Sequence, residues 1–63
     1  ISDDAKLVVL VKENPRKGKL AAKTFGFMMK CKTVGEWRRM CEEQGGDKGY
    51  LHSNIRKGYI AVK

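Results

Sequence analysis

The sequence predicts a small α+β domain, with three short helices and a two-stranded sheet formed by the N- and C-terminal strands. Three observations point to it: an apolar, β-branched run opens the chain, segments with helical apolar spacing follow, and a short β-prone segment closes it. With 63 residues the chain is one domain, residues 1–63, too small for a deep, water-excluding active site. Residues 1–5 carry no signal for regular structure and are candidates for disorder.

The first strand is expected over Leu7–Val11, a run of five apolar residues bounded by two lysines. It ends before Asn14-Pro15, because proline lacks a backbone N–H donor and disfavours helical geometry in the residue before it. Asn14, or a residue shortly after it, can cap a first helix whose apolar positions repeat at i, i+4 and i+7. This apolar stripe consists of Leu20, Ala21, Ala22, Phe25, Met28 and Met29.

A capping box at Thr33 and Glu36 opens the second helix and is the sharpest local signal in the sequence. The Thr33 hydroxyl can accept from the Glu36 amide, while the Glu36 carboxylate reaches back to the Thr33 amide. The helix should run to about Gln44, where Gly45-Gly46 supplies the left-handed residue that ends it. Its inward face is expected to hold Val34, Trp37 and Cys41.

The third helix is expected from Asp47, as its cap, to Lys57, with Gly58 ending it. Tyr59–Val62 is β-prone and should pair with the first strand. Two helices joined by a short glycine turn, the second basic and exposed, are typical of a helix-turn-helix. The predicted architecture is therefore winged-helix-like, with a wing that is rudimentary or absent because few residues follow Gly58.

The charge of the chain favours a polyanionic partner. Fourteen Lys and Arg against seven Asp and Glu give a net charge of +7. Residues 12–32 hold seven basic and one acidic side chain (+6), and residues 48–63 hold four basic and no acidic side chain (+4). We expect these two blocks to form one positive face. The alternative is that the lysines serve solubility alone.

Double-stranded DNA is the expected partner, as for a transcriptional or phage-type regulator. The third helix has no acid after its cap, which suits phosphate oxygens and base edges. We expect base contacts from Asn54, Arg56 and His52. We expect phosphate contacts from Lys12, Arg16, Lys17, Lys19, Lys48, Ser53 and Lys57, since the Asn-Pro turn also lies next to a helix N-terminus. A homodimer, or a larger parent protein, would supply further affinity.

Each of these residues also has a purely structural interpretation. Ser53 and Asn54 can form local backbone hydrogen bonds near a helix end or simply face solvent. Arg56 and Lys57 can complement the dipole of the last turn. The segment as a whole therefore carries more weight than any single residue.

Two other function classes stay open. One is a protein-interaction adaptor that binds an acidic partner surface. The other is RNA binding, in which an exposed aromatic such as Phe27 stacks on bases. An enzyme is not expected, because the only histidine, His52, has no evident nucleophile or orienting acid. The spacing of Cys31 and Cys41 matches no zinc motif, so no metal, cofactor or small-molecule substrate is expected.

The longest apolar run is too short to cross a bilayer, so no membrane association is expected. No signal peptide is visible, which favours a cytoplasmic location and reduced cysteines. Because the chain starts at Ile1 rather than Met, we expect its natural N-terminus to have been processed or to lie upstream.

The runs NPRKG, AAKTFGFM, TVGEW and GG and the closing Gly-Tyr-Ile resemble a group of short, largely uncharacterised bacterial and prophage-associated helix-turn-helix-like proteins. The resemblance covers Asn14 to Val62. Its framework positions are Asn14, Pro15, Thr33, Val34, Gly46, Leu51, Gly58 and Ile60. It implies the fold rather than an activity.

Overall fold

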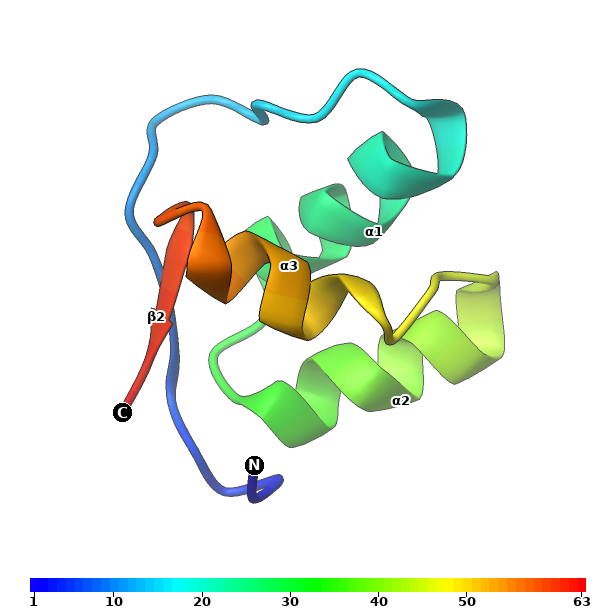
Figure 1. The fold of residues 1–63 in the computed structure, drawn as a ribbon. Coiled ribbons are helices and arrows are strands. Elements are labelled where there is room, and N and C mark those ends of the chain that lie inside the picture. Colours follow the sequence, from blue (N-terminus) through cyan, green and yellow to red (C-terminus); the bar gives the residue numbers. More distant parts are fainter.

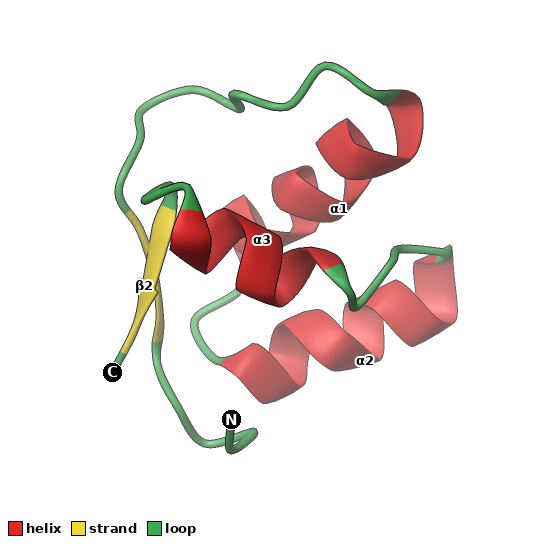
Figure 2. Ribbon diagram, in the orientation of Figure 1, coloured by secondary structure: helices red, strands yellow, loops and turns green.

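The computed structural model describes all 63 residues and contains three helices and two strands. Their order is β1 (Leu7–Val9), α1 (Lys19–Lys30), α2 (Val34–Gln44), α3 (Tyr50–Arg56) and β2 (Ile60–Val62). β1 and β2 pair antiparallel, with Val8 opposite Ala61. All three helices lie on the same side of this sheet (Figures 1 and 2). The predicted α+β class and the pairing of the terminal strands are confirmed.

The core lies between the helices and the sheet, with α1 packed against α2, α3 and β1. Trp37 and Phe25 are fully buried in it, and the Trp37 indole Nε1 donates a hydrogen bond to the Thr24 carbonyl oxygen at 3.1 Å. This bond satisfies the one polar atom of the indole, so the ring can be buried without an unpaired donor. The buried apolar cluster comprises Leu7, Phe25, Phe27, Met28, Val34, Trp37, Cys41, Leu51 and Ile60.

The start of α1 differs from the prediction. The Asn14 side chain does not cap the helix: its Oδ1 accepts from the Arg16 amide at 3.0 Å, and its Nδ2 donates to the Ala22 carbonyl at 2.7 Å. These bonds hold a turn around Pro15, and the helix begins only after Gly18, which provides no side-chain cap. The apolar stripe of α1 also differs, because Leu20 and Met29 are exposed while Phe27 and Thr24 are buried.

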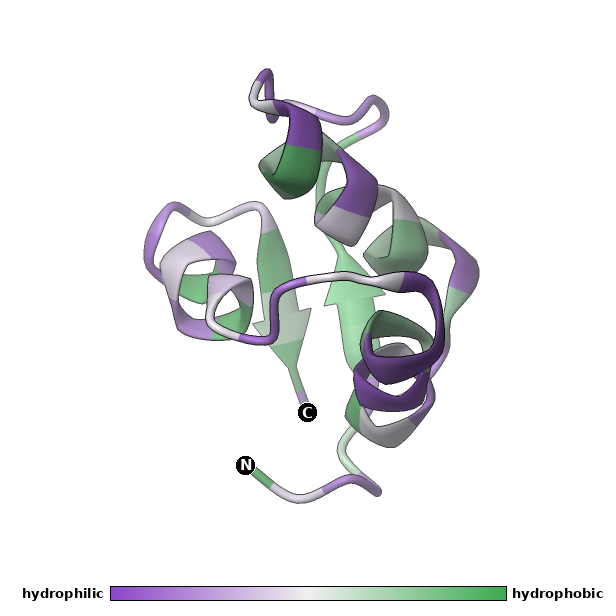
Figure 3. Cartoon of the chain, turned by 90° about the vertical axis from the view of Figure 1, so that its right-hand side faces the viewer, coloured by the Kyte–Doolittle hydropathy of each residue, from purple (hydrophilic) through white to green (hydrophobic).

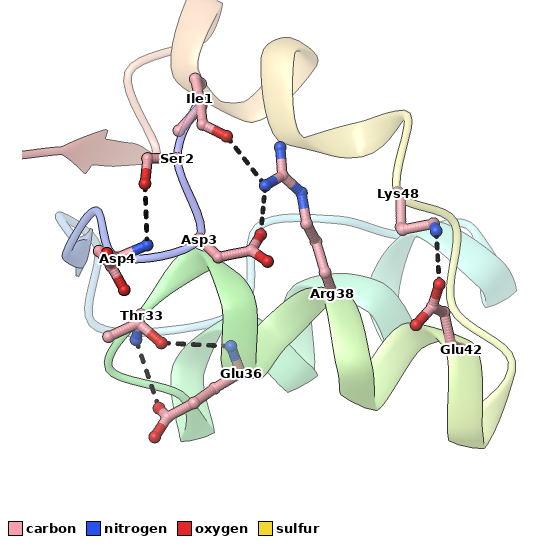
Figure 4. A network of polar contacts seen from close by, with 9 residues as sticks. All are labelled: Ile1, Ser2, Asp3, Asp4, Thr33, Glu36, Arg38, Glu42 and Lys48. Carbon is pink, nitrogen blue, oxygen red and sulfur yellow. Dashed lines mark hydrogen bonds and ion pairs between the residues drawn. The ribbon is translucent and has the colours of Figure 1, made fainter.

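The capping box at the start of α2 is confirmed. The Thr33 hydroxyl accepts from the Glu36 amide at 3.2 Å (Figure 4). Glu36 Oε1 accepts from the Thr33 amide at 3.3 Å, also drawn in Figure 4, and from the Lys32 amide at 2.7 Å. These two bonds lower the pKa of Glu36, because they stabilise its ionised form. Gly45 has a φ of 81° and ends the helix in the left-handed conformation, as predicted.

The first five residues lie against the N-terminal half of α2. Arg38 donates to the Ile1 carbonyl at 2.9 Å and pairs with the Asp3 carboxylate at 2.6 Å (Figure 4). The amides of Val34 and Gly35, which begin the helix, donate to the carbonyls of Ala5 and Asp3. The N-terminal segment therefore satisfies two helix donors that would otherwise lack partners.

α3 is shorter than predicted, because Asp47 caps a turn rather than the helix. Asp47 Oδ1 accepts from the Gly49 amide at 2.9 Å, and its backbone carbonyl accepts from Tyr50. This turn takes up Lys48 and Gly49, and the helix starts at Tyr50. Gly58, with a φ of 77°, ends it as predicted and turns the chain into β2.

Candidate nucleic-acid interface

The basic loop between β1 and α1 meets the beginning of α3. The loop runs along the top of the view in Figure 1 and of the side view in Figure 3, where much of it has hydrophilic colours. The guanidinium of Arg16 lies over the ring of Tyr50, 5.2 Å from its centroid. A cation over an aromatic face is an attractive arrangement, so the contact fixes the loop relative to α3. The predicted proximity of these two segments is therefore present.

The exposed face of α3 lies next to the contact between Arg16 and Tyr50. At 100° per residue, Tyr50, Ser53 and Lys57 fall on one stripe beside the loop, and His52 and Arg56 fall on the outward side. His52, Arg56 and Lys57 are exposed, and Ser53 is half-buried. Together with the loop these residues form what we call the loop–α3 surface. It consists of Lys12, Arg16, Lys17, His52, Ser53, Arg56 and Lys57.

Asn54 does not belong to this surface, which corrects its predicted contact with a base. Its side chain is fully buried against α1, with Nδ2 3.5 Å from the sulfur of Met28 and Oδ1 without any hydrogen-bond partner. The residue faces the core because it lies one turn from Leu51, the other buried position of α3. An amide in this position cannot reach a base edge.

Lys48 is exposed but already has an acidic partner. Its Nζ lies 2.9 Å from the Glu42 carboxylate, in an ion pair between α2 and the turn before α3 (Figure 4). An exposed pair of this kind contributes little stability, yet it partly balances the charge of Lys48. We therefore leave Lys48 out of the loop–α3 surface.

Not all of the positive charge lies on one face, contrary to the expectation from the sequence. The residues of α1 that meet α3 or the turn before it are Thr24, whose Oγ1 accepts from the Asp47 amide, and Met28, which touches Asn54. Lys19, Lys23 and Lys30 lie on the other side of α1 and are exposed. Lys19, a predicted phosphate contact, therefore belongs to α1 rather than to the loop–α3 surface.

The aromatic side chains do not form a stacking platform for bases. Phe25, Phe27 and Trp37 are all buried. Phe27 is the residue on which the RNA-binding alternative depended, and its burial removes that mode of contact. Tyr59 is half-buried and packs edge-on against Phe25 at a centroid distance of 6.1 Å. Only Tyr50, beneath Arg16, offers part of a ring near the basic surface.

The titratable groups include two thiols with raised pKa values and no cluster of metal-binding side chains. Burial raises the pKa of Cys41 to about 11 and also raises the pKa of the half-buried Cys31, and both are free thiols. No three His, Cys, Asp or Glu side chains come together, and the surface has no pocket. No helix combines the length and apolar composition that crossing a membrane requires.

Most residues of the loop–α3 surface were named from the sequence as candidate contacts, but two features of the structure were not predicted. One is the contact of Tyr50 with Arg16, which joins two segments 34 residues apart in the sequence. The outward lysine stripe on α1 was visible in the spacing of Lys19, Lys23 and Lys30, but their separation from α3 depends on tertiary packing.

Comparison of the chain with protein-family models, with curated proteins and with solved structures found no match.

Proposed function

We propose that this protein binds double-stranded DNA through the loop–α3 surface. The observation that carries the proposal is the contact between Arg16 and Tyr50, because it joins the basic loop to the exposed face of α3. The loop also contains one acidic residue, the exposed Glu13, but the seven side chains that define this surface are all basic or polar. No ion pair occupies any of them. Their charge is therefore available to phosphate oxygens.

We assign base and phosphate contacts according to where each side chain lies on α3 and on the loop. Arg56 and His52 project from the outward side of α3 and are the candidates for base edges in the major groove, where an Arg fork matches guanine. Lys12, Arg16, Lys17, Ser53 and Lys57 flank them and would hold phosphates. Because there are only two candidate base contacts, contacts to the phosphate backbone of the DNA supply most of the affinity, and the preference for a particular DNA sequence is weak.

The test is a titration of a 20-base-pair duplex of mixed sequence, followed by fluorescence anisotropy and by chemical-shift mapping. We expect shifts at residues 12–17 and 50–57, and an affinity that falls about 150-fold between 50 and 200 mM salt if the four phosphate-facing cations, Lys12, Arg16, Lys17 and Lys57, each neutralise one phosphate. Shifts confined to residues 36–44, or a flat salt response, would refute the proposal.

A matched pair of variants separates this surface from nonspecific charge. Replacing Lys17 and Lys57 by Gln removes two positive charges from the loop–α3 surface. Replacing Lys6 and Lys63 by Gln removes two from the far end of the sheet, where these residues pair through their backbones. Only the first variant should lower the affinity by an order of magnitude or more at low salt. Equal losses would mean that net charge alone matters. An adaptor for an acidic protein would show no duplex binding in any of these forms.

A further inference from the structure

One side of α1 forms a straight, basic stripe that the loop–α3 surface does not include. Lys19, Lys23, Gly26 and Lys30 recur at i, i+4, i+7 and i+11, the spacing that places residues in one line along a helix. We call these four residues the α1 ridge. Its three lysines are exposed, and α1 contains no acidic residue.

The α1 ridge faces away from α3. Thr24 and Met28 mark the side of α1 that meets the turn before α3 and α3 itself, through the Asp47 amide and the Asn54 side chain. At 100° per residue the centre of the ridge lies about 150° around the helix from the midpoint of these two residues. A straight duplex that lies along the exposed face of α3 therefore cannot also lie along the ridge.

Gly26, in the middle of the ridge, has no structural reason to be glycine. It lies inside a helix, where glycine is less favourable than alanine, and its φ is not positive. A methyl group built on it would meet only the Asn14 side-chain nitrogen, at 4.0 Å, which is an ordinary van der Waals distance. Gly26 is half-buried beside the Asn14 side chain, so glycine here leaves part of the helix backbone accessible to a ligand between Lys23 and Lys30.

The ridge lysines are not used in ion pairs. The two ion pairs of the protein involve Arg38 and Lys48. Lys23 lies beside the C-terminal end of α2. Its Nζ is 3.5 Å from the position that a Cβ atom would take at Gly45. A cation there also complements the dipole of α2, so Lys23 has a structural role as well.

We infer that the α1 ridge binds the phosphate backbone of a second duplex, so that one chain bridges two segments of double-stranded DNA. This inference rests on the proposed function, because the first segment is held by the loop–α3 surface. The ridge provides a row of three cations about 16 Å long and a partly accessible helix backbone between two of them, with no side chain placed to read bases. It therefore contacts phosphates alone.

The test is capture of a fluorescent 20-base-pair duplex by an immobilised duplex of the same sequence, mediated by the full chain. Single-duplex affinity is measured in parallel by anisotropy, and light scattering reports the oligomeric state. The ridge variant replaces Lys19, Lys23 and Lys30 by Gln. The control variant replaces Lys6, Lys32 and Lys63 by Gln, which removes the same charge from exposed positions near the sheet.

The wild-type protein and the control variant should capture the second duplex, whereas the ridge variant should capture at least about tenfold less while its single-duplex affinity falls about threefold or less. Gly26→Ala gives an independent readout, because it should raise the thermal midpoint and yet lower capture. Gly26→Gln should lower capture further. Reduced capture by a more stable variant cannot be attributed to misfolding.

Three outcomes would overturn the inference. Single-duplex binding without capture by the wild-type protein would leave the proposed function intact and remove bridging. Capture that survives in the ridge variant would mean that dimers, not the ridge, join the duplexes. Displacement of the second duplex by polyglutamate at equal charge concentration would make an acidic protein the better partner. If the wild-type protein binds no duplex at all, the proposed function fails as well.

Discussion

The side chains of Arg16 and Tyr50 join a loop without regular structure to the first residue of the last helix. Arg16 is half-buried in this arrangement, with its guanidinium carbon 5.2 Å from the centroid of the ring. The Asn14 turn positions the backbone of Arg16 from the other side, through the bond from the Arg16 amide to Asn14 Oδ1. The position of the loop is thus set by two contacts, one to its own turn and one to α3.

The first prediction concerns this pair. Tyr50→Leu removes the ring without changing any charge and should weaken duplex binding about two- to fivefold, the range that an exposed cation–π contact supports. Arg16→Gln should weaken it more, because a phosphate contact is lost as well. Arg16→Lys keeps the charge, so it should fall between the wild type and Arg16→Gln. Anisotropy at 100 mM salt measures all three. An unchanged affinity for Tyr50→Leu would show that α3 does not position the loop.

The second prediction concerns the buried amide of Asn54. Its Oδ1 has no hydrogen-bond partner, and an unsatisfied buried polar group costs about 1–3 kcal/mol. Asn54→Leu keeps the branched shape and should raise the free energy of unfolding by about 1–2 kcal/mol, measured by urea denaturation with circular dichroism. Asn54→Asp should lower it, because a carboxylate would lose its hydration there. Neither change should alter which duplex sequence is preferred. A changed preference would restore Asn54 as a base contact.

The third prediction concerns acid stability at the start of α2. The pKa of Glu36 is lowered from its ordinary value of 4.5 by hydrogen bonds from the Lys32 and Thr33 amides. The folded state therefore binds this proton less readily than the unfolded state. The contribution of Glu36 is fully present above pH 4.5 and is lost as the pH falls through the lower, folded pKa.

Glu36→Gln should accordingly flatten the decline in stability between about pH 5 and pH 3 in denaturation curves. Glu43→Gln, on the same helix but without a capping hydrogen bond, is the control and should leave the decline as it is. Thr33→Ala removes the other half of the capping box and should cost about 1 kcal/mol at all pH values. A decline that is identical in the wild type and Glu36→Gln would argue against the capping role of the carboxylate.

The fourth prediction concerns the two thiols. Cys41 is 2% exposed, and burial raises its pKa to about 11, whereas Cys31 is half-buried at the end of α1. Iodoacetamide at pH 8 should therefore modify Cys31 well before Cys41, as followed by mass spectrometry of peptides. In denaturant the two rates should converge. Equal rates in the native protein would indicate that α2 opens locally on the timescale of the reaction.

What could be predicted from the sequence depended on the range of the interactions. The capping box joins Thr33 to Glu36 within four residues, and Gly45 and Gly58 each end a helix through their own backbone geometry. Such features can be read locally, and the order of the elements follows from them. The pairing of the terminal strands followed because no other β-prone segment was available.

The remaining features depend on how distant segments pack. Asn54 lies one turn from Leu51, so helical spacing places it toward the core, but its packing against Met28 of α1 depends on tertiary structure. The lysines of α1 are a similar case. Their spacing defines a stripe along the helix, but only the contacts between α1 and α3 determine which way that stripe faces. Asn14 is a different case: its side chain had two local options, and the bond to Arg16 prevailed over helix capping because Pro15 intervenes.

The single tryptophan of the chain is completely enclosed, and its indole N–H is held by a backbone oxygen of α1. Its emission should be blue-shifted and shielded from aqueous quenchers such as acrylamide or iodide. The fluorescence of Trp37 therefore reports whether α1 and α2 stay packed against each other. Because Trp37 is buried and belongs to neither the loop–α3 surface nor the α1 ridge, a change in its emission on adding a partner would signal rearrangement of the interior rather than contact alone.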